Sequence, residues 1–238
     1  MMNGPTISDL LRKQDEYANS NIGTALKKNI DKAGFCYHVI TQSWDKKTIF
    51  NREVASYRQN LLCRLCTDRG IAILFSVTMP NHTHEVFLTP AWKTLSAMVT
   101  TLNGNVSKYI RMHDKEDGRL RNRRRIFDYC PKYVIVKDLA YLLYLGKYIY
   151  DNPAYLKAEG RAVPDSCYWM FEKGHFVVPY DERIYAQLFG LTYVQLLELY
   201  STNTKTDVLE YAKRLYAGWS AEDNARLFLR DATPSVNV

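Results

Sequence analysis

Two apolar segments, residues 71–75 and 86–88, flank the heptapeptide Met79-Pro80-Asn81-His82-Thr83-His84-Glu85. This pattern predicts a strand over residues 82–88 that contains two of the five histidines of the chain. Alternate residues of a strand point to the same face, so the imidazoles of His82 and His84 should lie side by side. Such a pair can chelate a divalent metal ion. A His-x-His pair alone is nevertheless a weak signal, which also arises by chance on a solvated strand.

A second informative segment is Tyr148-Ile149-Tyr150-Asp151-Asn152-Pro153, which ends a helical pattern over residues 138–151. Pro153 disfavours helical conformation at Asn152 and is expected to end the helix there. Tyr148 and Asn152 share one face of this helix. If that face lies against the histidine strand, two imidazoles and one amide oxygen can hold a metal ion beside a phenol nucleophile. The alternative is that Tyr148 is one of several core tyrosines, the others being Tyr141, Tyr144 and Tyr150.

The remaining periodicities complete the predicted fold. We expect strands at residues 35–43, 71–78, 82–88 and 126–136, and helices at residues 52–69, 94–112 and 138–151. The order β-α-β-β-α-β plus a final helix predicts an α+β protein with one antiparallel, ferredoxin-like sheet. Two helices should cover one face of this sheet, which leaves the other face for the metal ion and the tyrosine helix.

The two motifs, in this order, resemble those of the single-tyrosine HUH transposases, which are IS200-like, and most closely the REP-associated tyrosine transposase branch. That family reads strand, helix, strand, M-P-N-H-hydrophobic-H, helix, strand, and a helix ending Y-I-x-x-N-P. The resemblance covers about residues 33–170. Thr83 and Glu85 depart from it, because the family prefers apolar residues there, and residues 154–157 depart from its usual Val-x-Ala-Gly. Since a buried unpaired carboxylate is costly, Glu85 must be paired, or this strand is less covered than usual.

The resemblance implies a transposase that cleaves and rejoins single-stranded DNA, with palindromic hairpin repeats as its substrate. It implies that His82, His84 and Asn152 hold Mg²⁺ or Mn²⁺, and that Tyr148 forms a 5′-phosphotyrosine intermediate. Lys147 or Arg111 could help the phenol to lose its proton. In some relatives the tyrosine helix acts on the partner subunit, so a homodimer is compatible with the family. The competing interpretations are a domesticated nucleic-acid-binding protein of the same fold, catalytically weak or inactive, and a metal-dependent hydrolase of another class.

Charge and aromatic residues indicate where nucleic acid would bind. The net charge of +7 favours a polyanionic partner. Arginine makes bidentate phosphate contacts better than lysine, and it dominates the run before the last strand. The predicted DNA-binding residues are Arg119, Arg121, Arg123, Arg124 and Arg125, with Lys108 and Arg111 on the preceding helix. Trp44, Trp92 and Tyr129 are candidates for stacking on unpaired bases, and the sequence does not choose between them.

The chain divides into three expected parts. They are an N-terminal extension over residues 1–32, the transposase-like core over residues 33–172 and a helical C-terminal extension over residues 173–238. In the extension we expect helices at residues 180–188, 192–200, 206–216 and 221–229, which either pack on the core or form a helix-turn-helix reader.

Hydropathy and cysteine content bear on where the protein resides. No stretch predicts a membrane span. The odd number of five cysteines favours reduced thiols and a cytoplasmic protein. Cys63 and Cys66 form a C-x-x-C pair that we expect to be packed on a helix, because no second pair exists to complete a zinc site.

Overall fold

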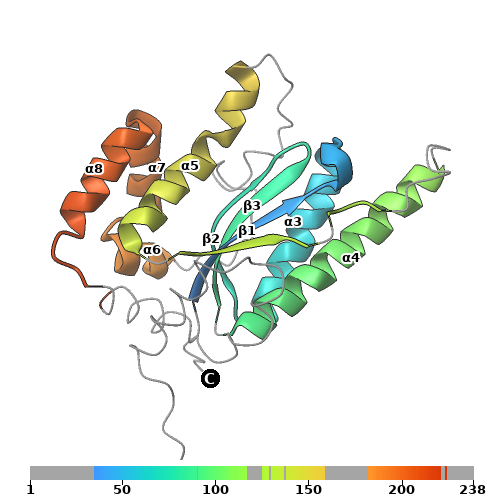
Figure 1. Ribbon diagram of the computed structural model, residues 1–238, viewed down its shortest axis with the longest axis horizontal. Coiled ribbons are helices and arrows are strands. Elements are labelled where there is room, and N and C mark those ends of the chain that lie inside the picture. The colour runs from blue at the N-terminus through green and yellow to red at the C-terminus, as the bar shows by residue number, and fades with distance from the viewer. Residues whose placement is uncertain are drawn as a thin grey trace, which may run out of the picture.

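The structure is a computed structural model, which describes residues 35–89, 91–116, 125–128, 130–136, 138–158, 182–220 and 223. At its centre lies one antiparallel sheet (Figure 1). The strands are β1 (Phe35–Gln42), β2 (Ala72–Thr78), β3 (His82–Thr89) and β4 (Lys132–Val136), in the order β2-β3-β1-β4. The predicted α+β fold with one β-α-β-β-α-β sheet is confirmed.

Helices cover both faces of the sheet. On one face, α3 (Arg52–Thr67) and α4 (Trp92–Glu116) pack against side chains that include Tyr37, Val39 and Phe87. On the other face, α5 (Leu139–Ala158) packs against a second cluster that includes Val86 and Leu88 (Figure 1). Neighbouring residues of β3 therefore serve different cores, as the two-residue period of a strand requires.

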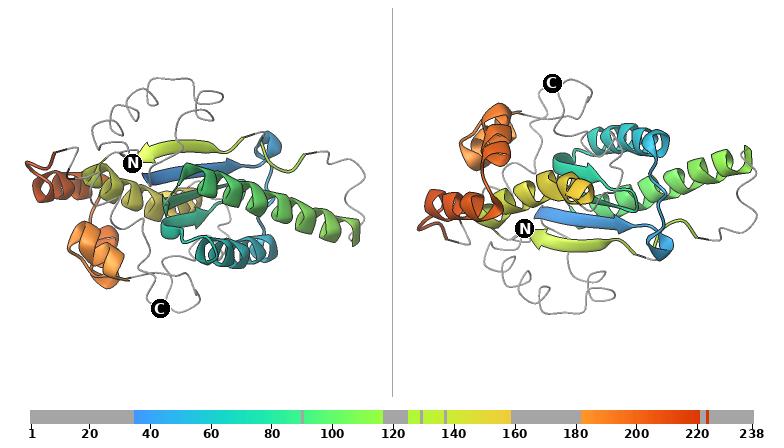
Figure 2. Two further views of the ribbon diagram at one scale, coloured as in Figure 1. Left: turned by 90° about the horizontal axis from the view of Figure 1, so that it is seen from below. Right: turned by 90° about the horizontal axis from the view of Figure 1, so that it is seen from above.

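Three further helices extend the α5 side of the molecule: α6 (Glu182–Phe189), α7 (Tyr193–Thr202) and α8 (Lys205–Leu215) (Figure 2). Buried tyrosines tie them to the core. Tyr185 donates to the Leu74 carbonyl of β2 at 2.6 Å, and Tyr200 donates to the Leu143 carbonyl of α5 at 2.9 Å. These helices thus pack on the core. The expected extension over residues 1–32 and the expected helix at 221–229, residue 223 apart, lie outside the described residues.

The two predicted boundaries that differ most from the structure both lie near a proline. The strand expected over 126–136 begins at Lys132, since Pro131 cannot donate a ladder hydrogen bond; Phe127 forms only an isolated bridge with Ser43. The helix expected to stop at residue 151 continues through Pro153 to Ala158. A proline removes only one helical hydrogen bond, and packing of the later turn against α8 can outweigh that loss.

Two smaller expectations concern the cysteines and the membrane. Cys63 and Cys66 are free thiols on α3, as predicted, and Cys66 is fully buried. Burial raises the pKa of the Cys63 thiol to about 11. Within the described part of the chain, no helix combines the length and apolarity that a bilayer crossing requires.

Candidate active site

The paired histidines lie on the sheet face that α5 covers. Within β3, His82 and His84 alternate with Thr83 and Glu85, and the rings of the two histidines are 4.9 Å apart at an interplanar angle of 82°. His84 is buried, whereas His82 is partly exposed. The side-by-side imidazoles that the strand pattern predicts are therefore present.

Each of these imidazoles has a polar partner at its Nδ1 atom. Asn81 Oδ1 lies 2.7 Å from His82 Nδ1, and His38 Nε2 of β1 lies 2.9 Å from His84 Nδ1. An amide oxygen only accepts, so His82 carries a proton on Nδ1, and in the neutral ring the lone pair is then on Nε2. Metal-binding histidines characteristically donate the second ring N–H to a neighbouring acceptor, which fixes the tautomer. Both histidines have this arrangement when His84 Nδ1–H donates to His38.

Burial keeps His84 and His38 neutral. It lowers the pKa of His84 to about 3, with further lowering by His38 and His82, and lowers the pKa of His38 to about 4. A neutral imidazole is the form that binds metal ions. The sequence analysis missed His38. The only signal for it was its position within a predicted strand, and its contact depends on the pairing of His38 with Val86, which places it beside His84.

The α5 helix brings Tyr148 to the same site. Its ring lies edge-on to His84, with centroids 5.6 Å apart and an interplanar angle of 87°. The other tyrosines of α5 lie against different side chains: Tyr141 and Tyr144 contact each other, Tyr150 contacts Tyr200, and Tyr155 contacts Lys205. Tyr148 is therefore the α5 tyrosine that meets the histidine pair, and it does so within one chain.

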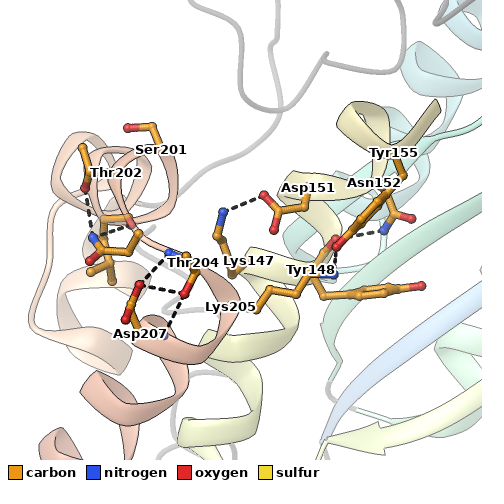
Figure 3. Close-up of polar contacts among 12 residues, drawn as sticks. Lys147, Tyr148, Asp151, Asn152, Tyr155, Ser201, Thr202, Thr204, Lys205 and Asp207 are labelled. Carbon is orange, nitrogen blue, oxygen red and sulfur yellow. Dashed lines mark hydrogen bonds and ion pairs between the residues drawn. The ribbon is translucent and has the colours of Figure 1, made fainter. Parts of the chain in front are cut away.

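Asn152 lies one turn beyond Tyr148 and is buried. Its Nδ2 atom donates to the Tyr148 carbonyl at 3.0 Å (Figure 3), which leaves Oδ1 as the atom of the amide suited to a metal ion. Among the described residues, no three side chains of His, Cys, Asp or Glu gather as a metal site. Two imidazoles and one amide oxygen are nevertheless a donor set that fits a divalent metal ion, and the second partners of both imidazoles are in place.

Behind the histidines, Glu85 is paired, which is the first of the two alternatives that the sequence left open. Arg58 of α3 donates from Nη1 to Glu85 Oε1 at 2.6 Å, and Thr83 donates to Glu85 Oε2 at 3.0 Å. Both charged side chains are only 1% exposed. Burial raises the pKa of the Glu85 carboxyl, while Arg58 and Thr83 act in the opposite direction.

The two cations suggested to assist the phenol do not lie beside it. Lys147 forms an ion pair with Asp151 at 2.6 Å (Figure 3), and Arg111 lies on α4, on the opposite face of the sheet. The cation over the Tyr148 ring is Lys205, with Nζ 4.7 Å from the ring centroid. No sequence pattern pointed to Lys205.

The predicted DNA-binding residues are only partly described. Arg119, Arg121, Arg123 and Arg124 lie outside the described residues, whereas Arg125 places its guanidinium 4.7 Å from the Trp44 ring centroid. Lys108 is exposed on α4 together with Arg111. The structure thus does not bring these two residues to the histidine pair.

The stacking candidates differ in exposure. Trp92 is buried against Tyr37 and Tyr133, and Tyr129 lies outside the described residues. Trp44 is 43% exposed. It begins the short 3-10 turn η1 (Trp44–Lys46), and Asn81 Nδ2 donates to the Lys46 carbonyl at 3.1 Å. Because the same amide contacts His82, the exposed tryptophan is on a turn tied directly to the histidine strand.

Fold and site together define a class of protein: an antiparallel sheet whose central strand carries a histidine pair, faced by a tyrosine on a helix of the same chain. Comparison with known families assigns the class. Residues 32–151 match the family described as "Transposase IS200 like". Since this match spans half of the chain, the protein belongs to the IS200-like transposase family, and the family resemblance is confirmed.

Comparisons with solved structures and with curated proteins add little to this family assignment. A solved structure, described as a REP-associated tyrosine transposase bound to a REP hairpin, is similar with a TM-score of 0.42 and 12% identity, covering 63% of this chain and 94% of that chain. No curated protein matches significantly. Helices α6 to α8 lie beyond the matched family segment.

Proposed function

We propose that this transposase-family protein is a metal-dependent tyrosine endonuclease of the HUH type, which cleaves and rejoins single-stranded DNA. The observation that carries the proposal is the position of the Tyr148 ring, which lies edge-on to His84. His84 and His82 share strand β3, and the Nδ1 atom of each has a polar partner. A phenol nucleophile beside a preorganised metal site is what phosphoryl transfer through a covalent intermediate needs.

In this reaction the Tyr148 phenolate oxygen attacks the scissile phosphorus. The new bond joins this oxygen to phosphorus, and the bond from phosphorus to the 3′-oxygen breaks, giving a 5′-phosphotyrosine and a 3′-hydroxyl after protonation. Attack by a second 3′-hydroxyl reverses these bond changes and joins a new strand. His82, His84 and Asn152 would hold Mg²⁺ or Mn²⁺, which supplies charge stabilisation at a non-bridging phosphate oxygen when bound.

The DNA surface is proposed to include the exposed Trp44 and its neighbour Arg125. An exposed indole can stack on an unpaired base, and a guanidinium can contact the adjoining phosphate. The turn that carries Trp44 is linked through Asn81 to His82, so a base stacked there would be close to the histidine strand. The remaining arginines of residues 119–124, together with Lys108 and Arg111, are proposed as further phosphate contacts. The proposed substrate is a palindromic hairpin.

The competing proposal of a binding protein without catalysis rested on Thr83, on Glu85 and on the altered sequence after Asn152-Pro153. The side chains of Thr83 and Glu85 have partners on the α3 side of the sheet, away from the histidines. These two residues therefore give no reason to expect a damaged active site. Likewise, the described residues contain no group of three His, Cys, Asp or Glu side chains that could hold a metal ion. Such a group would have favoured a hydrolase of another class.

The test uses single-stranded oligonucleotides that carry palindromes from the DNA flanking the gene. Each is incubated with protein and Mg²⁺ or Mn²⁺ and run on a denaturing gel. We expect a metal-dependent covalent adduct that disappears in Tyr148→Phe and His82→Ala. Tyr150→Phe is the matched control, because this tyrosine lies on the same helix but packs against Tyr200. An adduct that persists in Tyr148→Phe would refute the assigned nucleophile, and hairpin binding without any adduct would favour the non-catalytic alternative.

A further inference from the structure

A lysine from the C-terminal helices reaches the tyrosine of the active site. Lys205 is the first residue of α8, and its Nζ atom lies 4.7 Å from the ring centroid of Tyr148 and 4.5 Å from that of Tyr155. It also donates to the Tyr155 hydroxyl at 2.6 Å. Figure 3 shows the side chain extending from the start of α8 to α5, where both tyrosines lie.

The position of this lysine is unfavourable for the helix that carries it. The N-terminus of a helix is the positive end of its dipole, so a cation at the first position is locally disfavoured. The Thr204 and Asp207 capping box stabilises the start of α8 without Lys205. The contact of the ammonium group with α5 is therefore not explained by the needs of α8 alone.

We propose that Lys205 is a positioning residue for the nucleophile, so that the C-terminal helices complete the active site built by the transposase fold. The inference rests on the proposed function. It also goes beyond the family, because the matched family segment ends at residue 151 and α8 lies beyond it.

The geometry explains how Lys205 would act. A tyrosine ring on a helix has several staggered side-chain rotamers available. His84 contacts the Tyr148 ring edge-on, and the Lys205 ammonium lies over the ring within the range of a cation–π interaction. Two contacts from different elements restrict the ring to one orientation beside the histidines. Holding a nucleophile in its attacking orientation lowers the entropic part of the barrier.

The first measurement does not depend on activity. With 3-fluorotyrosine incorporated at position 148, the fluorine NMR resonance reports the surroundings of the ring. We expect Lys205→Met, which keeps length and removes charge, to shift or broaden this resonance, whereas Lys205→Arg should preserve it. Lys213→Met is the matched control, since Lys213 lies on the same helix and pairs with Glu210 at 2.9 Å. An unchanged resonance in Lys205→Met would overturn the inference.

The second measurement is single-turnover adduct formation with the palindromic oligonucleotide. Loss of a cation–π contact predicts a rate about 2- to 30-fold lower in Lys205→Met, with the dissociation constant for the oligonucleotide unchanged and the rate restored in Lys205→Arg. Equal losses in the methionine and arginine variants would refute positioning by charge. If the wild-type protein formed no adduct while the fluorine resonance responded to Lys205→Met, the proposed nuclease would be refuted and the positioning contact supported.

Discussion

Replacing Arg58 by methionine tests how the buried carboxylate of Glu85, on the α3 side of strand β3, is stabilised. Arg58 and Glu85 are each 1% exposed and joined at 2.6 Å, and Arg58 Nε has no hydrogen-bond partner among the described residues. The pair is thus desolvated and incompletely satisfied. Removing one member of a buried pair typically costs about 3–5 kcal/mol, because the other charge is left without compensation. We expect a loss of this size in the free energy of unfolding at neutral pH.

The loss should depend on pH in a defined direction. Burial raises the pKa of the Glu85 carboxyl, and without Arg58 it should rise further. The folded state then binds the proton more tightly than the unfolded state, in which the pKa of glutamate is about 4.3. Stability is therefore lost as pH rises from this ordinary value through the raised one. Urea unfolding should show a smaller deficit for Arg58→Met at about pH 5 than at about pH 8.

A double variant separates the charge from the packing. Arg58→Met combined with Glu85→Leu removes both charges at similar volume, and buried pairs replaced in this way are often neutral or more stable by about 1–4 kcal/mol. Adduct formation should be retained, because the pair faces away from the histidines. A pH-independent deficit in Arg58→Met, or one below about 1 kcal/mol at pH 8, would refute the reasoning.

Three other predictions follow from the same structure. His38→Ala should weaken Mn²⁺ binding by about 10- to 100-fold in calorimetric titration, as expected for the loss of a partner that orients a ligand; unchanged affinity would remove His38 from the site. Trp44→Ala should weaken oligonucleotide binding by about 1–3 kcal/mol in fluorescence anisotropy, whereas Trp219→Ala, at a similarly exposed tryptophan, should not. Gly146→Ala should lower thermal stability by about 1–3 kcal/mol, because a Cβ there would meet Phe75 Cζ at 2.6 Å and also the Tyr200 hydroxyl. Gly104→Ala, with nothing within 4 Å, should not be destabilising, and equal melting temperatures for the two variants would contradict the packing argument.

The parts of the site that follow from local periodicity could be predicted from the sequence. Residues two apart on a strand share a face, which placed His82 beside His84, and residues four apart on a helix share a face, which placed Tyr148 with Asn152. The same alternation put Glu85 on the opposite face, where it needed either a partner or a less covered strand; the structure shows the partner. The identity of that partner, Arg58, depends on how α3 is rotated against the sheet, which no local pattern encodes.

Contacts between distant elements were beyond local patterns. His38 meets His84 through strand register, and Lys205 meets Tyr148 only because α8 packs along α5. Local preferences even opposed two features: a lysine is disfavoured at the start of a helix, and Pro153 is disfavoured inside one. In both places packing between helices outweighed the local preference, and both places adjoin the proposed nucleophile.

Glu85 stands where the resembled family prefers an apolar residue. This change alters the chemistry of strand β3 without changing its register. A slip of one residue would turn both histidines into the α3 core and would turn Glu85 toward α5. Glu85 opposes that slip, because its partner Arg58 lies on α3 and would be left without its carboxylate. We infer that the paired glutamate keeps both histidines facing Tyr148, so its presence is compatible with a working active site.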